Sequence, residues 1–432
     1  MTDCDTIFAL SSGQPPAGIA VIRISGPRAG EALMALAGKL SEPRRATLAW
    51  LRDPGEEEGG VLDHALTLWF PGPDTATGED LAELHLHGGR SVIAAVSHSL
   101  GALPGLRPAR AGEFTRRAFE NGRIDLAEAE GLADLLTAET EAQRRNAIAM
   151  ASGELSREVE RWRRELLAAS ARIEAILDFS DEDDVDEQDA AAFEAALQIA
   201  NEIEQWLARP SAERLRDGVR VVLAGPPNAG KSTLLNALAG REAAITAPTA
   251  GTTRDLIEAP VAMGGTAYLL TDTAGLRDGA EEIERIGVER ARNALDSADI
   301  ILWLDAVENC PDPARSIIVH PRADLPGREP PPSSADVAVS AKTGQGLDQL
   351  TALIGERARK LLPGEGEVAL NRRQRLVLAE CADALRASEG SSDLILIAEA
   401  NRLGRAALDR LTGRAGVEDM LDALFGAFCI GK

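Results

Sequence analysis

A glycine-rich stretch, GPPNAGKS, carries the clearest chemical signal in the chain. Its Gly225, Gly230, Lys231 and Ser232 match the spacing G-x-x-x-x-G-K-[ST] at every position. An apolar run precedes the stretch and an amphipathic helical run follows it, as this pattern requires. In such a loop, backbone N–H groups bind phosphates, Lys231 would reach the β- and γ-phosphates, and Ser232 would bind Mg²⁺. A chance glycine-rich turn is the alternative, and the flanking runs disfavour it.

Downstream residues supply the remaining groups of a nucleotide site. Two β-like runs joined at Gly264 and Gly265 predict an antiparallel hairpin that ends in the sequence DTAG. Its Asp272 can hold Mg²⁺ through water, and the N–H of Gly275 can meet a γ-phosphate. The segment APTAGTTRD lies in a loop that can close over the metal ion. In order, spacing and residue type, this region resembles a translation-factor-class GTPase domain with a Ras-like P-loop fold.

The expected guanine-reading segment departs from its usual pattern. GTPases of this class read guanine with N-K-x-D after a strand, whereas here SIIVH is followed by Pro321, Arg322, Ala323 and Asp324. Asp324 can still accept hydrogen bonds from guanine, and Arg322 can stack on the base. Pro321 lacks the amide that would bind the base and tether the phosphate loop. We therefore expect guanine selectivity with weakened affinity, and the segment SAKTGQG resembles the second guanine-contacting loop.

The elements that position these residues follow from periodicity. Residues 1 to about 120 mix short β-like runs with Pro/Gly-rich turns, which predicts an α/β domain. From about 124 to 215 apolar residues recur at helical spacing, and residues 220–360 alternate strand and helix, as in a mostly parallel sheet. The chain is helical again to its end. Because two helical regions flank the α/β region, we expect one helical domain with an α/β domain inserted into it.

Composition excludes several classes of protein. A chain of 432 residues suffices for about three domains. Its net charge of −23 argues against binding nucleic acid over the whole surface. Four scattered cysteines form no C-x-x-C pair, which excludes a local zinc site and a disulfide framework. The acidic N-terminus and the lack of a long apolar run predict neither a secretory signal nor a membrane span, so we expect a cytoplasmic protein.

Motifs along the whole chain resemble one family, the bacterial tRNA modification GTPases called MnmE or TrmE. They are DTIFAL, GIAVIRISG, TGEDLAELHLHGG, GEFTRRAFENGRIDLAEAE, NAGKSTLLNALAGREAAI, AGTTRD, DTAGLR, IERIGVERA and the terminal FCIGK. The resemblance implies a tetrahydrofolate-binding and dimerisation domain over 1–120, and a helical domain in two parts, 121–215 and 361–432. It places a Ras-like GTPase domain, 216–360, between these two parts.

The same resemblance implies a K⁺-activated GTPase that works with MnmG (also called GidA), an FAD-dependent partner. Together they would add a carboxymethylaminomethyl-type group at C5 of the tRNA wobble uridine. The one-carbon unit would come from a tetrahydrofolate derivative, in the 5-formyl or methylene form. The implied partners are GTP, tRNA, a second copy of the chain in a homodimer, and MnmG in a heterotetramer.

Several nucleotide-site roles are implied by position in the family's motifs. Leu276, after DTAG, cannot orient an attacking water, and Glu284 matches the glutamate that does so. The alternative for Glu284 is a solvated glutamate at the start of a helix. Arg277 matches a switch residue tied to coupling with modification. Asn228 matches a ligand of the K⁺ ion that takes the place of an arginine finger when two GTPase domains meet.

The implied ligand sets are larger. The GTP-binding residues would be Asn228, Ala229, Gly230, Lys231, Ser232, Thr233, Ala247, Pro248, Thr249, Ala250, Gly251, Thr252, Thr253, Asp272, Thr273, Ala274, Gly275, Asp324, Ser340, Ala341 and Lys342. Mg²⁺ would be held by Ser232 and Thr253, and K⁺ by Asn228, Ala247, Thr249 and Thr252.

A folate site is implied at Arg23, Glu83, Arg123 and Lys432. Glu83 can pair with the donor edge of a pterin while cations meet a glutamate tail. An ordinary cross-strand ion pair of Arg23 with Glu83 is the alternative. Cys429 would lie near the bound one-carbon unit and take part in the chemistry, or be a buried apolar cysteine on a terminal helix. A prenylation signal is disfavoured, because the last two residues do not fit C-a-a-X.

The most basic stretch is RPARAGEFTRRAFENGR, with a charge of 5 − 2 = +3. Its arginines are Arg107, Arg110, Arg116, Arg117 and Arg123, against Glu113 and Glu120. It could contact tRNA phosphates or line the folate site. Because the whole chain is acidic, we expect a partner to supply most of the tRNA-binding surface.

Other interpretations of the sequence stay open. His85 and His87 share one face of a probable strand, but no third metal ligand is apparent. The acidic run DFSDEDDVDEQD lacks the spacing of a calcium loop and suits a solvated inter-helix loop. The chain could also be a ribosome-assembly GTPase without modification chemistry, or a folate-dependent transferase with a weakened GTPase domain.

Overall fold

The computed structural model describes residues 5–55, 60–178, 188–241, 243–244, 257–273, 292–326, 330–364, 366–391, 393–415 and 418–431. The chain divides into two compact units, one of residues 1–133 with 412–432 and the other of residues 134–411. The division differs from the domain ranges expected above, because it groups the last 21 residues, 412–432, with the N-terminal region. Each unit is described separately.

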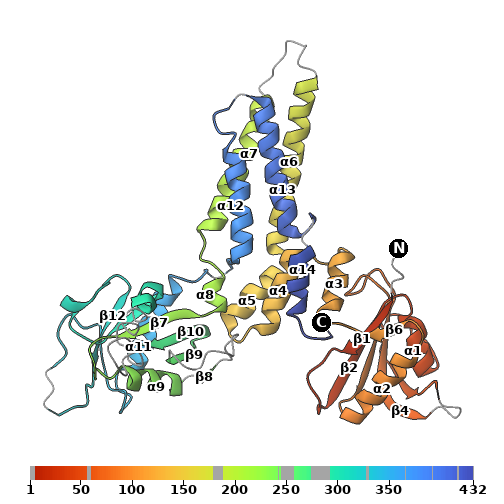
Figure 1. Ribbon diagram of the computed structural model, residues 1–432, viewed down its shortest axis with the longest axis horizontal. Helices are drawn as coiled ribbons and strands as arrows, with labels where there is room; N and C mark the ends of the chain where they lie inside the picture. Colours follow the sequence, from red (N-terminus) through yellow and green to blue (C-terminus); the bar gives the residue numbers. More distant parts are fainter. Residues whose placement is uncertain are drawn as a thin grey trace, which may run out of the picture. The chain divides into compact units, whose positions relative to one another are not determined.

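The first unit is built on a six-stranded sheet of order β3-β4-β5-β2-β1-β6 (Figure 1). The strands are β1 (Thr6–Leu10), β2 (Ile19–Ser25), β3 (Thr47–Arg52), β4 (Val61–Phe70), β5 (Leu81–His87) and β6 (Leu106–Pro108). Neighbouring strands are antiparallel except β1 and β6, which are parallel. The α/β character expected for this region is confirmed.

The two faces of this sheet bury different residues. Alternate strand residues such as Ile22 and Leu84 pack against Leu33 of α1 (Ala29–Ala37) and Leu100 of α2 (Arg90–Ala102). On the opposite face, Ile7 and Ala9 pack against Phe114 of α3 (Glu113–Glu120). This alternation is the period-two pattern that the strand sequences carry.

The C-terminal tail packs on the first unit. Phe425 of α14 (Glu418–Gly426) and Phe428 join Leu126 of α4 (Leu126–Thr137) in one buried cluster. Beyond the helix, the hydroxyl of Ser11 donates to the carbonyl of Gly431 at 2.8 Å. An isolated bridge joins Ile430 to Ala111. The tail is thus held by hydrogen bonds and apolar contacts with residues that are distant from it in sequence.

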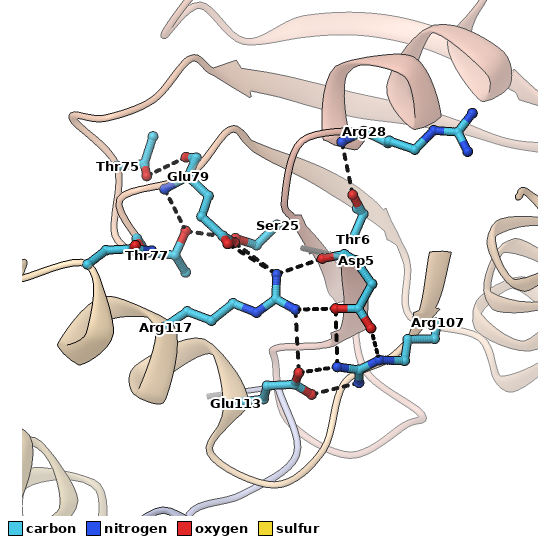
Figure 2. A network of polar contacts seen from close by, with 11 residues as sticks. Asp5, Thr6, Ser25, Arg28, Thr75, Thr77, Glu79, Arg107, Glu113 and Arg117 are labelled. Atoms are coloured by element: carbon cyan, nitrogen blue, oxygen red, sulfur yellow. Dashed lines mark hydrogen bonds and ion pairs between the residues drawn. The ribbon is translucent and has the colours of Figure 1, made fainter. Parts of the chain in front are cut away.

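A buried polar cluster joins β1, β2, α3 and the loop before β5 (Figure 2). Arg117 donates to Asp5 at 2.8 Å and to Glu79 at 3.0 Å, and its side chain is 8% exposed. Arg107 pairs with both Asp5 and Glu113, and Glu79 also accepts a hydrogen bond from Ser25 at 2.7 Å. Burial alone would raise the pKa of Glu113, but hydrogen bonds from Arg107 and from the N–H of Arg110 hold it below its usual value.

The second unit contains a seven-stranded sheet of order β13-β12-β11-β7-β10-β9-β8. The strands are β7 (Val219–Ala224), β8 (Ala243–Ala244), β9 (Ile257–Met263), β10 (Thr266–Asp272), β11 (Ile300–Trp303), β12 (Ser316–Pro321) and β13 (Val337–Val339). The pairs from β13 to β10 are parallel, whereas β9 is antiparallel to β10. The predicted hairpin, with its turn at Gly264 and Gly265, is confirmed.

Helices cover both faces of this sheet. Leu234 of α9 (Lys231–Arg241) and Ile354 of α11 (Leu347–Arg359) pack on one face, against Leu223 and Leu302 among others. Ala294 and Leu295, in the helical residues 292–297, pack on the other face. Between β11 and β12 the chain forms only a short 3-10 turn (Val307–Asn309), because this connection is short for a helical crossover.

Helices from before and after the sheet in sequence form one bundle (Figure 1). They are α6 (Glu154–Asp178), α7 (Gln188–Ala208), α12 (Arg372–Arg386) and α13 (Leu394–Thr412). Trp162 of α6 meets Trp206 of α7 edge to face at 6.3 Å. Ion pairs tie Arg163 to Asp409 and Arg386 to Glu204. In the part of the chain that the structure describes, none of the helices is both long and apolar enough to cross a bilayer.

A substitution at Gly112 tests whether the C-terminal tail is packed closely against α3. The φ of Gly112 is +66°, and a Cβ there would lie 2.2 Å from the carbonyl oxygen of Phe425. Gly122, with φ +65°, has open space at the same position and is a matched control. Alanine at either site should cost about 1–2 kcal/mol of backbone strain, and only Gly112→Ala should also displace the tail. Limited proteolysis should cut near residues 426–431 faster in Gly112→Ala alone, and equal rates in the two variants would contradict the packing.

Because of the polar cluster, we expect substitutions of two neighbouring arginines to differ strongly in their effect on the stability of the first unit. Arg117→Met removes the buried cation that Asp5, Glu79 and Glu113 share, and should destabilise the first unit by about 3–5 kcal/mol. Arg116 on the same helix pairs with Glu120 and Asp422 and is 40% exposed, so Arg116→Met should cost at most about 1 kcal/mol. Hydrogen exchange of amides in β1 and α3 measures both effects. Similar exchange in the two variants would show that the cluster stabilises little.

Candidate nucleotide site

The phosphate loop lies between β7 and α9, as the sequence predicted. Gly225 and Gly230 have φ values of +142° and +100°, and Asn228 has φ +59°. A Cβ on Gly225 would lie 3.2 Å from backbone atoms of Leu304, so both conformation and space favour glycine there. The N–H of Ala229 donates to the carbonyl of Pro226 at 3.3 Å within the loop.

Three predicted polar side chains converge beside this loop. The ammonium of Lys231, a buried residue, donates to the carbonyls of Gly225 at 3.0 Å and Pro226 at 2.8 Å. The hydroxyl of Ser232 donates to the carboxylate of Asp272, which is fully buried at the end of β10. Parallel pairing of β10 with β7 places Asp272 opposite Leu223, whose carbonyl accepts from the Thr273 hydroxyl at 2.9 Å. A hydroxyl and a carboxylate side by side are oxygen ligands of the kind that Mg²⁺ prefers.

The two segments expected to read guanine also meet. The N–H of Ala323 donates to the carbonyl of Val339 at 3.0 Å, which holds the ends of β12 and β13 together. A hydrogen bond from the buried Ser340 hydroxyl lowers the pKa of Asp324. Lys342 adds a favourable charge nearby. Asp324 is therefore fixed as an ionised acceptor, the form that guanine N–H donors require.

Arg322 makes a contact that the sequence did not predict. Its guanidinium donates to the carbonyl of Asn228 in the phosphate loop, and its φ is +60°. The contact ties the segment after β12 to the loop, which is the tether that Pro321 cannot provide. The sequence signal for this contact was the cation next to Pro321. From the sequence alone we expected Arg322 only to stack on the base.

Part of the predicted site lies outside the residues that the structure describes. These residues are Ala247, Pro248, Thr249, Ala250, Gly251, Thr252, Thr253, Ala274, Gly275, Arg277, Glu284 and Lys432. They include most of the proposed K⁺ ligands and the glutamate proposed to position water.

The predicted folate residues are only partly brought together. Arg23 and Glu83 pair across β2 and β5 at 2.9 Å, and the other oxygen of Glu83 lies 3.2 Å from Nε2 of His85. This contact is the cross-strand ion pair named as the alternative, and it also presents both groups on one face of the sheet. Arg123 donates instead to Asp74 at 3.3 Å. Cys429 is exposed, so the buried-cysteine alternative was wrong.

Ion pairs reduce the free charge of the basic stretch. Arg107 and Arg117 belong to the buried cluster (Figure 2). Arg116 pairs with Asp422. Asp5, Glu79 and Asp422 add three acidic groups to the stretch that carries +3 in sequence. The stretch therefore presents less net positive charge than its sequence alone suggests.

The two candidate histidines have acidic partners. His85 contacts Glu83, and Nδ1 of His87 lies 2.7 Å from Asp63. Within the described ranges, no group of three or more His, Cys, Asp and Glu side chains is arranged to hold a metal ion.

Comparisons with known proteins agree with the motifs. The family model "MnmE helical domain" matches residues 126–429, and "GTP-binding protein TrmE N-terminus" matches residues 6–123. The protein "tRNA modification GTPase MnmE" of Rhizorhabdus wittichii is 61% identical over 99% of this chain and 97% of its own. The protein of the same description from Novosphingobium aromaticivorans is 59% identical over 99% and 100%.

Among solved structures, Era of Aquifex aeolicus is 25% identical over 38% of this chain and 66% of its own, with a TM-score of 0.24.

The two family models together span almost the whole chain, and the relatives align with it from end to end. The chain therefore belongs to the MnmE family of tRNA modification GTPases.

Proposed function

We propose that this chain hydrolyses GTP and takes part in the modification of tRNA. One observation carries the GTPase part of the proposal: Lys231, Ser232 and the buried Asp272 converge on a strand–loop–helix phosphate loop. The guanine part is supported by Asp324, which Ser340 and Lys342 hold in its ionised form. The role in tRNA modification is supported by full-length similarity to proteins that bear that description.

The proposed architecture is a GTPase domain inserted into a helical domain. Its support is that α6 and α7 precede the seven-stranded sheet in sequence, α12 and α13 follow it, and all four pack together. The N-terminal α/β unit would bind a tetrahydrofolate one-carbon derivative and a second copy of the chain. The exposed Cys429 and the fixed tail around it suit a role beside that unit.

The two metal ions would have distinct roles. Ser232 and Asp272 fit Mg²⁺, because the chain holds their oxygen atoms together at the phosphate loop. When bound, Mg²⁺ would neutralise phosphate charge. The side-chain amide of Asn228 would bind K⁺, which would supply positive charge in place of an arginine finger. Its left-handed backbone is a conformation that asparagine tolerates better than most residues.

The complete reaction would need a partner. The chain would act in the cytoplasm as a homodimer with MnmG, an FAD protein, in a heterotetramer that adds a carboxymethylaminomethyl-type group at C5 of the wobble uridine. The net charge of −23 supports a partner that supplies most of the tRNA-binding surface. Purified chain with MnmG, GTP, the one-carbon folate and glycine, the amine that supplies the carboxymethylamino part of the group, should modify an unmodified tRNA. GTP hydrolysis without modification would favour the ribosome-assembly alternative.

Potassium activation is tested at Asn228. Wild-type protein should hydrolyse GTP faster in KCl than in NaCl at equal ionic strength. Asn228→Gly removes the amide but keeps the left-handed backbone accessible, so it should bind GTP and lose the preference for K⁺. Single-turnover rates and binding of a labelled GTP analogue measure the two properties. A retained K⁺ preference in Asn228→Gly would remove this residue from the ion site.

The loop tether is tested at Arg322. Arg322→Ala removes one hydrogen bond between a cation and a carbonyl at an exposed site and should weaken GTP binding by about 2- to 10-fold. Arg322→Lys keeps a donor and should lose less. Pro321→Asn should tighten binding by restoring the amide that the family pattern has. Titration of each variant with GTP and ATP measures these effects, and ATP binding as tight as GTP binding would refute the assigned guanine selectivity.

A further inference from the structure

The amino-terminal turn of helix α5 (Glu141–Ala151), in the second unit, contacts the nucleotide-binding sheet. The N–H of Ala142 donates to the carbonyl of Gly265 at 3.3 Å, in the turn that joins β9 to β10. Strand β10 starts at this turn and ends at Asp272, which accepts the hydrogen bond from Ser232. One strand therefore contacts α5 at one end and the phosphate loop at the other.

Two side-chain amides on α5 hold the connections that lead into and out of the sheet. The Nε2 of Gln143 donates to the carbonyl of Leu215 at 2.9 Å, just before β7. The Oδ1 of Asn146 accepts from the N–H of Ala369 at 2.7 Å, just before α12, and Ala369 is fully buried. We name Gln143 and Asn146 the α5 clasp.

The orientation of the Gln143 amide is fixed by its surroundings. Its oxygen accepts from the N–H groups of Glu139 at 2.8 Å and Thr140 at 2.9 Å, which completes a capping box with the Thr140 hydroxyl. Its nitrogen therefore faces the Leu215 carbonyl. One side chain thus caps α5 and binds the entering connection.

The entering connection is in turn tied to the sheet. Arg214 of α8 (Glu213–Arg216) donates to Asp299 at 2.8 Å, and the other oxygen of Asp299 accepts from the N–H of Arg220 in β7 at 3.0 Å. Leu215 packs with Ala369 and Ala142 in one small apolar cluster. A displacement of β10 or β7 when the nucleotide changes would therefore act on α5, which is followed directly by the bundle helix α6.

We propose that the α5 clasp couples the state of the nucleotide to the helical bundle, so that Gln143 and Asn146 are positioning residues for tRNA modification. This inference rests on the proposed function. Both residues act through backbone groups of the connections, and neither belongs to the phosphate loop. Loss of the clasp should separate GTP hydrolysis from modification instead of lowering both.

Three substitutions of similar size distinguish coupling from folding. Gln143→Glu keeps the oxygen that caps α5 but replaces the donor to Leu215 by a second acceptor, so the helix remains and the clasp breaks. Asn146→Asp keeps the acceptor for Ala369 and is the matched control, whereas Asn146→Leu removes that acceptor. The holoenzyme with its modification partner is used throughout, and GTP turnover and modified tRNA are measured in the same reactions.

The proposal predicts a change in the ratio of the two rates. Gln143→Glu and Asn146→Leu should lower the modification formed per GTP hydrolysed by about 2- to 30-fold, with GTP turnover within about two-fold of wild type. Asn146→Asp should behave as wild type. A wild-type ratio in Gln143→Glu, or hydrolysis and modification reduced in equal proportion, would overturn the proposal.

Hydrogen exchange provides a readout that does not depend on tRNA. In wild type, protection of the Ala142 amide should differ between GDP and a GTP analogue, and Gln143→Glu should lose this difference. Exchange that responds to nucleotide in wild type, without any modification of tRNA, would refute the proposed function and leave the clasp supported. No difference between nucleotides in wild type would refute the clasp itself.

Discussion

A backbone hydrogen bond from Ala212 to Leu370, at 3.0 Å, joins the segment that enters the nucleotide-binding sheet to the segment that leaves it. The bond requires both ends of the sheet-bearing segment to lie at one place. Glu213 reinforces it by accepting from the N–H of Arg372 at 2.6 Å. With its ends held together, the segment can fold around its own core while the helices before and after it pair in one bundle. The phosphate loop, the ends of β12 and β13 that are proposed to read guanine, and α5 all depend on this junction for their relation to the bundle.

Charge is handled differently in the two units. In the second, the buried carboxylate of Asp272 faces a hydroxyl donor and lies at the end of a parallel strand, where a divalent cation would compensate it. In the first, Asp5, Glu79 and Glu113 are compensated by arginines of the same unit. Burial of these ions is tolerated because each cation is shared among several acceptors. The arrangement at Asp272 in the second unit is suited to binding a ligand. The arginine–carboxylate cluster of the first unit holds its elements together.

Local patterns predicted most of what is local in the structure. The phosphate loop and the Gly264–Gly265 hairpin each follow from contiguous residues whose types determine backbone conformation. Asp324 and Ser340, which were separately assigned to guanine, also meet, because parallel strands bring their carboxyl ends to one edge.

Contacts between distant residues could not be predicted in this way. Arg117 looked like part of a cationic surface, because its acidic partners Asp5 and Glu79 lie far from it in sequence. The exposure of Cys429 depends on where the tail packs, which no local pattern fixes. Arg322 stands beside a proline that breaks the expected motif, and only the folded chain brings its guanidinium to Asn228.

We propose that GTP hydrolysis at this phosphate loop serves tRNA modification. The most direct test analyses wobble nucleosides by mass spectrometry in tRNA from a strain that lacks this chain, complemented with wild type or with Lys231→Ala. The C5 modification should disappear in the deletion strain, return with wild type and not return with Lys231→Ala. Unchanged modification in the deletion strain, or full restoration by Lys231→Ala, would contradict it.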